Sequence, residues 1–357
     1  MKFLGWTFRL KPLPDELLSS WLTRVAFAHG QTPYVFHNLH LPGLPVWNRD
    51  VDRAHGAGLV AAISAVSGVS ATRIRAASLE RYSKLGLDAS AHGEWPFVLA
   101  AGIYHRKRRR HGLQFCPNCL SAETAYFRRS WRLAFILKCP ACSMTLSDAC
   151  PHCDAPVVPH RALSDMRACH RCGGNICSGA SGTEYSSVPA DGGMQALLST
   201  AASRRAVSWL GGRQRPSEAL LTAAILTRMV PPKRIDDCRR AIGLPVCPIP
   251  MSPERFERQR LQERTLRIET VGKWASDWPR TFRLGASALG LTRRSFAGIA
   301  LPHSLDSEVA RLPTGQTRPR RLKPLLLGPE LRAVRRRSVA AYRHLRASRI
   351  MQAVAPR

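Results

Sequence analysis

The sequence predicts a mainly α-helical protein with a small β component, in which two helical regions flank a cysteine-rich module. Four C-x2-C pairs lie between residues 116 and 172, and segments with helical spacing of apolar residues precede and follow them. The chain has 357 residues, of which 45% are hydrophobic, so it is long enough for two or three domains with cores of their own.

The first predicted helix lies in "LPDELLSSWLTRVAFAHG", residues 13–30. Asp15 stands where an N-cap is expected, and Gly30 stands where a helix would stop. We therefore expect a helix that buries one face in the N-terminal region. The apolar residues at helical spacing are Leu17, Leu18, Trp21, Leu22, Val25 and Ala28.

Residues 60–79, "VAAISAVSGVSATRIRAASL", contain two short helical patterns on either side of Gly68. A small residue in the first helix, here Ser64, and a turn glycine permit the close crossing of a helix-turn-helix. Arg73 and Arg75 fall on its exposed side and are candidate DNA contacts. The same pattern also fits an ordinary pair of helices, so the residues leave both interpretations open.

The four C-x2-C pairs predict two tandem zinc ribbons. Neighbouring pairs are separated by nineteen and then fifteen residues, which is the spacing of a zinc ribbon. Each C-x2-C turn places two thiolates on one side of a loop, and two such knuckles complete a tetrahedron around Zn²⁺. Sequential pairing predicts two Zn²⁺ ions per chain, one held by Cys116, Cys119, Cys139 and Cys142 and one by Cys150, Cys153, Cys169 and Cys172. Interleaved pairing, with the first pair joining the third, is the alternative.

Other cysteines and histidines near these pairs receive a different interpretation. Eight well-spaced thiolates leave no vacancy for a further ligand, so His152, His160 and His170 are expected to be surface histidines. The isolated cysteines are interpreted as small buried apolar residues. They are Cys177, Cys238 and Cys247.

Aromatic residues alternate with arginines between the first two knuckles. This combination suits the binding of nucleic acid, but a small ribbon also needs apolar residues for a core of its own. We favour the second interpretation, a local core. The aromatic residues are Tyr126, Phe127, Trp131 and Phe135, and the arginines are Arg128, Arg129 and Arg132.

Helical patterns return after a Ser/Gly-rich stretch at residues 177–193, over 194–210 and 216–230. A second helix-turn-helix-like pattern covers residues 281–299, where Arg293 and Arg294 would begin the second helix and contact bases or phosphates. The expected domains are an N-terminal helical, helix-turn-helix-like domain (1–112), a tandem zinc-ribbon module (113–177), a linker (178–193), a C-terminal helical domain with the second helix-turn-helix-like element (194–310) and a basic tail (311–357).

The charge balance predicts a polyanionic partner. The chain has 54 Lys and Arg against 24 Asp and Glu, a formal net charge of +30, and nucleic acid is the commonest partner of such a field. No apolar stretch reaches membrane-spanning length and the N-terminus offers no signal-peptide core, so we expect no membrane partner and a cytoplasmic protein whose cysteines bind metal. Further candidate DNA contacts are the basic residues Lys107, Arg109, Arg110, Arg335, Arg336 and Arg337.

An ordered set of motifs resembles the TniQ family of transposition proteins, to which TnsD-type target selectors belong. The motifs are "LPDELLSSWLTRVA", "FCPNCL", "YFRRSW", a C-x2-C pair, "L-x3-CPHC" and a closing C-x2-C pair, between about residues 10 and 175. "WPRTF" at residues 278–282 is a weaker likeness. Cys142 stands where many relatives have histidine, a change that preserves a zinc ligand but leaves the subgroup open.

The resemblance implies a non-catalytic adaptor. Such proteins link a target, which is double-stranded DNA or a CRISPR surveillance complex, to an AAA+ ATPase that regulates a DDE transposase. The resemblance also implies that the eight cysteines are zinc ligands and that the segment Asp15 to Trp21 belongs to a region that contacts partners. A homodimer is left open. The alternative is a sequence-specific transcription regulator using the same elements. A metal-dependent nuclease is disfavoured because acidic residues are scarce and isolated.

Overall fold

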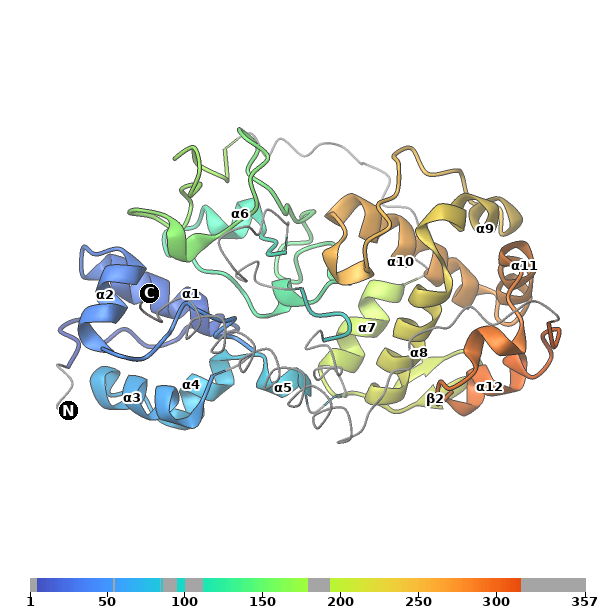
Figure 1. Cartoon of the computed structure of the whole chain (residues 1–357), viewed down its shortest axis with the longest axis horizontal. Coiled ribbons are helices and arrows are strands. Elements are labelled where there is room, and N and C mark those ends of the chain that lie inside the picture. Colours follow the sequence, from blue (N-terminus) through green and yellow to red (C-terminus); the bar gives the residue numbers. More distant parts are fainter. Residues whose placement is uncertain are drawn as a thin grey trace, which may run out of the picture.

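The structure, a computed structural model, describes residues 5–53, 55–83, 85, 95–99, 112–178 and 193–315. These residues are mainly helical with few strands, which confirms the predicted fold class. In Figure 1 the N-terminal helices lie on the left, the cysteine-rich module lies above the centre and the C-terminal helices lie on the right. Most of the predicted linker and tail lie outside the described residues, as do Lys107, Arg109, Arg110, Arg335, Arg336 and Arg337.

The first helix, α1 (Leu18–Ala28), begins later than the sequence predicts. Leu17 immediately precedes the helix and Asp15 has a left-handed backbone (φ 57°), so the N-cap prediction for Asp15 is wrong. The Asp15 carboxylate instead accepts a hydrogen bond from the Ser130 hydroxyl at 2.7 Å. Gly30 (φ 68°) ends the helix as predicted, because glycine adopts the left-handed conformation without strain.

The N-terminal core forms where α1 packs against α2 (Pro33–His40) and the segment that precedes α1. The Trp6 ring lies 5.7 Å from the Trp21 ring and 5.5 Å from the Phe36 ring, measured between centroids, and all three side chains are buried. The α3 and α4 helices cover the other side of this core, to which they contribute Ile63, Val66 and Ile74.

The helices α3 (Ala57–Ser67) and α4 (Ala71–Ala77) meet at 114°, and a short helix, α5 (Glu80–Ser83), follows. Gly68 has a φ of 70° between them, and the Ser70 hydroxyl caps α4 by accepting a hydrogen bond from the Arg73 amide. Within the part of the chain that the structure describes, no single helix is long and apolar enough to cross a membrane. Only α3 and α4 taken together, across their bend, have the required length and composition.

The cysteine-rich module is built from short hairpins with little regular structure. Its helical segments are α6 (Pro117–Leu120) and the 3₁₀ turns η1 (Ser130–Arg132) and η2 (Pro159–Arg161). Phe127, Trp131 and Phe135 are each at most 1% exposed, as the interpretation as core residues predicts, and Tyr126 is half-buried. The core that they join is not local to the ribbon, because the same hydrophobic cluster continues into the C-terminal helices.

The C-terminal region begins with α7 (Met194–Ala202), which ends eight residues before the predicted limit at residue 210. The chain then forms a hairpin in which β1 (Val207–Trp209) pairs antiparallel with β2 (Gly212–Gln214). Leu210 (φ 50°) and Gly211 (φ 79°) form the two-residue turn, and positive φ at both positions is typical of tight hairpins. The hairpin therefore replaces the last turns of the predicted helix.

The remaining helical elements of the C-terminal region are α8 (Pro216–Met229), η3 (Pro232–Arg234), α9 (Ile235–Ala241), η4 (Phe256–Arg258), α10 (Leu261–Ser276), α11 (Arg280–Leu289), η5 (Arg293–Phe296) and α12 (His303–Val309). The α10 helix contacts α7, α8, α9 and α11. The helix predicted over 216–230 is confirmed as α8. Gly285 permits the close crossing of α11 and α10, since a Cβ atom there would lie 2.1 Å from the Trp274 indole nitrogen.

The second helix predicted within residues 281–299 is only a 3₁₀ turn. After α11 and Gly290 (φ 64°), Arg293 and Arg294 begin η5, which ends at Phe296. Gly298 adopts a left-handed backbone (φ 75°) two residues later and prevents continuation of a helix. The prediction of a recognition helix that begins at Arg293 and Arg294 is therefore wrong, although both arginines are exposed.

Buried charged residues join the three parts of the molecule. Arg132 of the cysteine-rich module contacts Asp50 and Asp52 of the N-terminal region, with N–O distances of 2.6 and 2.8 Å. On the other side of the module, Arg264 of α10 donates to the Ala134 carbonyl at 2.6 Å and to the Gln114 side chain at 2.9 Å. The module therefore lies between the two helical regions and is held by hydrogen bonds to both.

Candidate metal centres and nucleic-acid interface

Three of the four C-x2-C pairs have the same local geometry, each at the tip of a short hairpin. The residue before the first cysteine bridges to the residue six positions after that cysteine, as in Lys138–Thr145, Ala149–Pro156 and Ala168–Asn175. The residue after the second cysteine has a left-handed backbone in each, at Ser143 (φ 61°), Asp154 (φ 52°) and Gly173 (φ 74°). The remaining pair, Cys116 and Cys119, is held by the single turn of α6.

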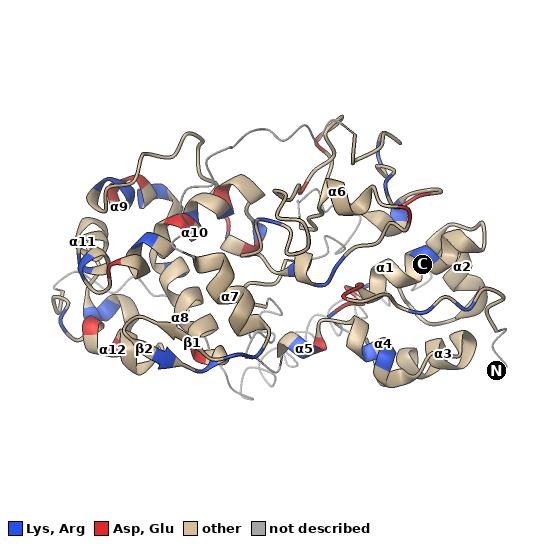
Figure 2. Cartoon of the chain, turned by 180° about the vertical axis from the view of Figure 1, so that it is seen from behind, with Lys and Arg blue, Asp and Glu red and all other residues tan. Residues whose placement is uncertain are grey.

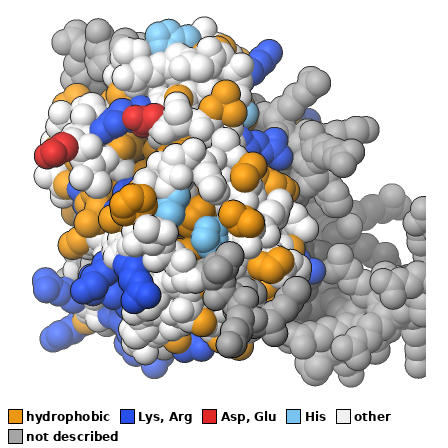
Figure 3. Space-filling model, turned by 90° about the vertical axis from the view of Figure 1, so that its left-hand side faces the viewer, with side chains coloured by type: hydrophobic (Ala, Val, Ile, Leu, Met, Phe, Trp, Pro, Cys, Tyr) orange, Lys and Arg blue, Asp and Glu red, His pale blue; other side chains and the backbone are white. Residues whose placement is uncertain are grey.

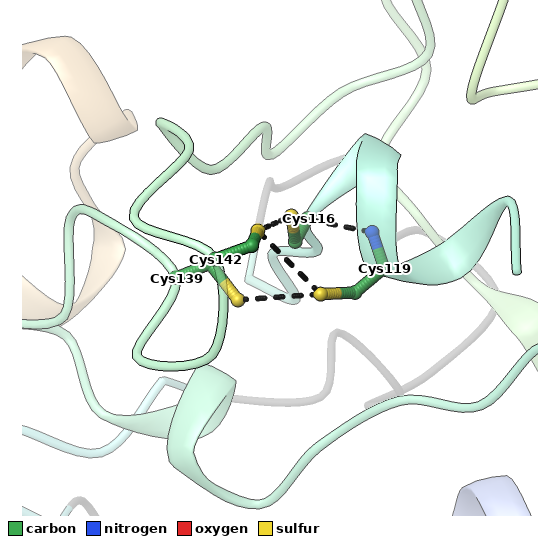
Figure 4. A group of neighbouring side chains, drawn as sticks. All are labelled: Cys116, Cys119, Cys139 and Cys142. Carbon is green, nitrogen blue, oxygen red and sulfur yellow. Dashed lines mark hydrogen bonds between the residues drawn. The ribbon is translucent and has the colours of Figure 1, made fainter.

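The first group of four thiols brings two knuckles together. The sulfur of Cys142 lies 3.4 Å from that of Cys116 and 3.6 Å from that of Cys119, and the sulfurs of Cys119 and Cys139 are 3.7 Å apart (Figure 4). All four sulfurs lie within 4.8 Å of one another. Cys116 and Cys139 are buried, whereas Cys119 and Cys142 are half-buried.

The second group repeats the arrangement with Cys150, Cys153, Cys169 and Cys172. The sulfurs of Cys150 and Cys172 are 3.7 Å apart, as are those of Cys153 and Cys169. The grouping in both clusters is the one that sequential pairing gives, and not the interleaved alternative. The second cluster lies nearer the surface, because Cys172 is exposed.

These distances fit a tetrahedral zinc ion. With Zn–S bonds of about 2.3 Å, the sulfurs of a tetrahedral site lie about 3.8 Å apart, and the sulfur distances above are 3.4–3.7 Å. The hydrogen bond between the Cys116 and Cys139 thiols raises the pKa of Cys116 and lowers the pKa of Cys139 to about 4. Neighbouring thiols thus oppose full ionisation of the group, and a divalent cation at the centre would favour it.

The neighbouring histidines do not join either group. His152 is exposed and contacts the Asn175 carbonyl and the Ser178 hydroxyl, and His170 is half-buried. His160, predicted to lie on the surface, is buried and stacks on Trp47 with ring centroids 4.8 Å apart, so that prediction is wrong. Burial lowers the pKa of His160 to about 3.

The isolated cysteines join neither group of four thiols. Cys238 is fully buried, as the apolar interpretation predicts, whereas Cys177 and Cys247 are only half-buried. Burial raises the pKa of Cys238 to about 11 and that of Cys247 to about 12, so both thiols are neutral near neutral pH.

The sequence motif around Asp15 lies in the N-terminal region, and it contacts the motif around Arg129 in the cysteine-rich module. The Leu17 amide donates to the Phe127 carbonyl at 2.9 Å, and the Arg129 amide donates to the Asp15 carbonyl at 2.7 Å. The Arg129 side chain also lies 3.3 Å from the Asp15 carboxylate. The segment Asp15 to Trp21 is expected to contact partners. Polar groups of this segment therefore already form hydrogen bonds and an ion pair within the chain.

Sequence reasoning missed Arg132 as the residue that fixes the N-terminal region to the module. Its side chain is 0% exposed, and its guanidinium donates to both Asp50 and Asp52 and to the Leu99 carbonyl. Asp52 also accepts hydrogen bonds from the Ser19 amide and hydroxyl, both at 2.7 Å, at the start of α1. Burial raises the pKa of Asp52 to about 6, against the opposing effect of Arg132.

The predicted DNA contacts in the described residues lie at two separate places. Arg73 and Arg75 are exposed on α4, and Arg73 donates to the Pro12 carbonyl at 3.2 Å. Arg293 and Arg294 are exposed on η5, between α11 and α12, and these two helices lie at the opposite end of the molecule in Figure 1. Arg293 donates to the Leu312 carbonyl at 3.0 Å.

The N-terminal end of the molecule also carries an apolar surface, in addition to the exposed arginines of α4. Residues 25–48 contain no Asp, Glu, Lys or Arg, and the α2 helix exposes Tyr34, Val35 and Leu39 by 49–59%. Figure 3, which faces this end, shows hydrophobic and histidine side chains across its middle and Lys and Arg side chains gathered below them. The main group of cationic side chains on this face therefore lies below the apolar ones, and other Lys and Arg side chains border them.

Comparison with known proteins identifies the class. The structure defines a helical protein with two four-cysteine groups arranged as for metal binding, and residues 7–146 match the model of the TniQ family. Over this region the chain is similar to the TniQ family, and the match supports a TniQ-family transposition protein. This match confirms the resemblance seen in the sequence. A comparison with curated proteins found no match.

Proposed function

We propose that the chain is a non-catalytic adaptor for target-site selection in transposition. It binds double-stranded DNA, a targeting complex such as a CRISPR surveillance complex, or both, and links the target to the AAA+ ATPase that regulates a DDE transposase. The TniQ match over residues 7–146 carries this proposal. The transcription-regulator alternative uses the same DNA-binding elements but gives no reason for that match.

Each four-cysteine group would hold one Zn²⁺ ion, giving two per chain. The donors support this, because four thiols at tetrahedral spacing suit zinc and leave no open position for water. The ligands of the first site would be Cys116, Cys119, Cys139 and Cys142, and those of the second Cys150, Cys153, Cys169 and Cys172. The metal would supply folding energy to a module that has little regular secondary structure.

The DNA partner is supported by charge. An excess of thirty positive charges favours a polyanion, and the described parts of both helical regions expose arginines. Arg73, Arg75, Arg293 and Arg294 are the candidate contacts within the described residues. Contacts to phosphates would position the chain on DNA, whereas reading of sequence needs contacts to base edges.

The test combines two measurements on the purified, zinc-loaded chain. The first is selection from a random double-stranded DNA pool at near-physiological salt, and the second is co-purification with the ATPase of the same transposon. ATPase binding with an enriched motif means that the adaptor finds its own site; ATPase binding without one means that the address comes from another complex. An enriched DNA motif without ATPase binding supports the transcription-regulator alternative. Failure to bind either DNA or the ATPase overturns the proposal.

A further inference from the structure

Unpaired arginines from both helical regions lie along one edge of the molecule. They come from α4, α5, the end of α7 and strand β2, and none of them forms an ion pair within the described residues. Five are exposed and one, Arg81, is half-buried. We call this set the arginine track: Arg73, Arg75, Arg81, Arg204, Arg205 and Arg213.

The track is continuous between the two helical regions. Only Ser78 and Leu79 separate α4 from α5, and the Arg204 guanidinium donates to the Arg81 carbonyl at 3.4 Å, which joins α5 to the end of α7. Figure 2 shows Lys and Arg along the lower edge from β2 through α5 to α4. This edge therefore presents one row of positive charge instead of two separate patches.

Acidic residues near the track do not neutralise it. Glu80 precedes Arg81, and its side chain is 43% exposed, so it places one negative charge beside the six arginines. Its carboxylate lies 3.8 Å from His55 and forms no ion pair with an arginine of the track in the described structure. Glu218 lies near the hairpin, and its carboxylate is 2.8 Å from Arg215, which is not part of the track. The arginines of the track thus keep their charge for a partner.

The hairpin directs one arginine of the track away from the core. Arg213 pairs with Ser208 across the hairpin, and both residues are exposed, whereas Val207 and Gln214 are buried. A two-stranded ribbon is narrow enough to enter the major groove of DNA, and its exposed side chains reach the backbone on either side. The hairpin therefore suits contact with a duplex.

The backbone at Arg204 gives independent support. The helices α1, α3, α9 and α11 end at glycines with φ between 64° and 73°, namely Gly30, Gly68, Gly243 and Gly290. The α7 helix ends in the same way, but with Arg204 at φ 63°. A side chain is strained in this conformation and glycine is not. The chain thus carries a cationic side chain where backbone stability favours glycine.

We propose that the arginine track binds the phosphate backbone of a DNA duplex that runs across both helical regions. This inference rests on the proposed function, which requires DNA binding, and it adds the surface that the duplex contacts. Each arginine that neutralises a phosphate releases counterions, so each contributes about 0.9 to the slope of log affinity against log salt concentration.

The experiment compares variants of the full, zinc-loaded chain. The track variant is Arg204→Gly with Arg205→Ala and Arg213→Ala, and the control is Arg228→Ala with Lys233→Ala. Both control residues are exposed and lack an ion pair in the described structure, and Arg228 lies about 18 Å along α8 from Pro216. The dissociation constant for a 30-base-pair duplex of mixed sequence is measured by fluorescence anisotropy between about 50 and 300 mM salt.

The track variant should lower the salt slope by about 2.7 and the affinity by about two orders of magnitude at 150 mM salt, and the control should change neither. Arg204→Gly alone should weaken DNA binding but raise the thermal unfolding midpoint, because glycine is not strained at φ 63°. A purely structural role of Arg204 does not give this combination. If the wild-type chain binds DNA and the track variant behaves like the control, the track is wrong and the proposed function stands. If the wild-type chain binds no DNA at low salt, DNA binding itself fails, and the track with it.

Discussion

Replacement of Arg132 tests how the N-terminal region is fixed to the cysteine-rich module. Arg132→Met keeps an apolar stem of similar length but removes the guanidinium, which donates hydrogen bonds to Asp50, Asp52 and the Leu99 carbonyl at 2.6–3.3 Å. Asp50 and Asp52 are each 1% exposed, so the variant leaves two carboxylates buried without a counter-charge.

The expected loss in free energy of unfolding is about 3–5 kcal/mol at pH 8, which is typical when one partner of a buried ion pair is removed. The loss should shrink as the pH falls. Burial already raises the pKa of Asp52 to about 6 in the presence of Arg132, and removal of the arginine would raise it further. The folded variant then binds a proton more tightly than the unfolded chain, so acid stabilises it and rising pH destabilises it.

The assay is urea unfolding of the zinc-loaded chain, followed by tryptophan fluorescence, at pH 8 and pH 6. The matched control is Arg132→Met combined with Asp50→Asn and Asp52→Asn, which removes all three charges and should be more stable than the single variant at pH 8. A single-variant loss below about 1 kcal/mol at pH 8 would refute the reasoning, because a true buried pair costs more than that when broken. Equal losses in the single and triple variants would refute it too.

Three further predictions concern the metal centres and the two cores. Cys142→Ser should reduce the zinc content from about two ions per chain to about one, and an unchanged elemental analysis would contradict the first site. Because burial lowers the pKa of His160 to about 3, the wild-type chain should lose about 2 kcal/mol of stability through this residue as the pH falls from 7 to 5. His160→Phe should abolish that part of the pH dependence in urea unfolding. Gly285→Ala should cost about 1–3 kcal/mol by overpacking against Trp274, and an unchanged melting temperature would exclude the close approach.

The sequence predicted local features well because their determinants lie within a few residues. A C-x2-C knuckle needs only a tight turn, and the end of α1 needs only a glycine after the last helical turn, as Gly30 provides. The buried pairs of Arg132 with Asp50 and Asp52 span 82 and 80 residues, and no local pattern indicates them. In the sequence Arg132 looks like one more arginine beside aromatic residues.

Helix limits were less predictable where turn chemistry opposed the apolar periodicity. Residues 194–210 have helical spacing throughout, but Gly211 and Gly212 favour a hairpin turn, and pairing of β1 with β2 places Trp209 in the core. Local turn preference and burial of one aromatic side chain together outweighed the helical pattern. The same competition shortened the segment after Gly290 to a 3₁₀ turn.

The distribution of arginines also changes the interpretation of the net charge. Arg132, Arg239 and Arg264 are each at most 1% exposed, so part of the formal charge of +30 joins the regions of the molecule and cannot meet a partner. Arg239 pairs with Glu269 at 2.8 Å inside the C-terminal core, and Arg264 donates to the Ala134 carbonyl. Among the described residues, the salt dependence of DNA binding should therefore depend on the exposed arginines that lack an ion pair, and not on the total charge. Buried arginines such as Arg132 would affect DNA binding only by fixing the two ends of the arginine track relative to each other.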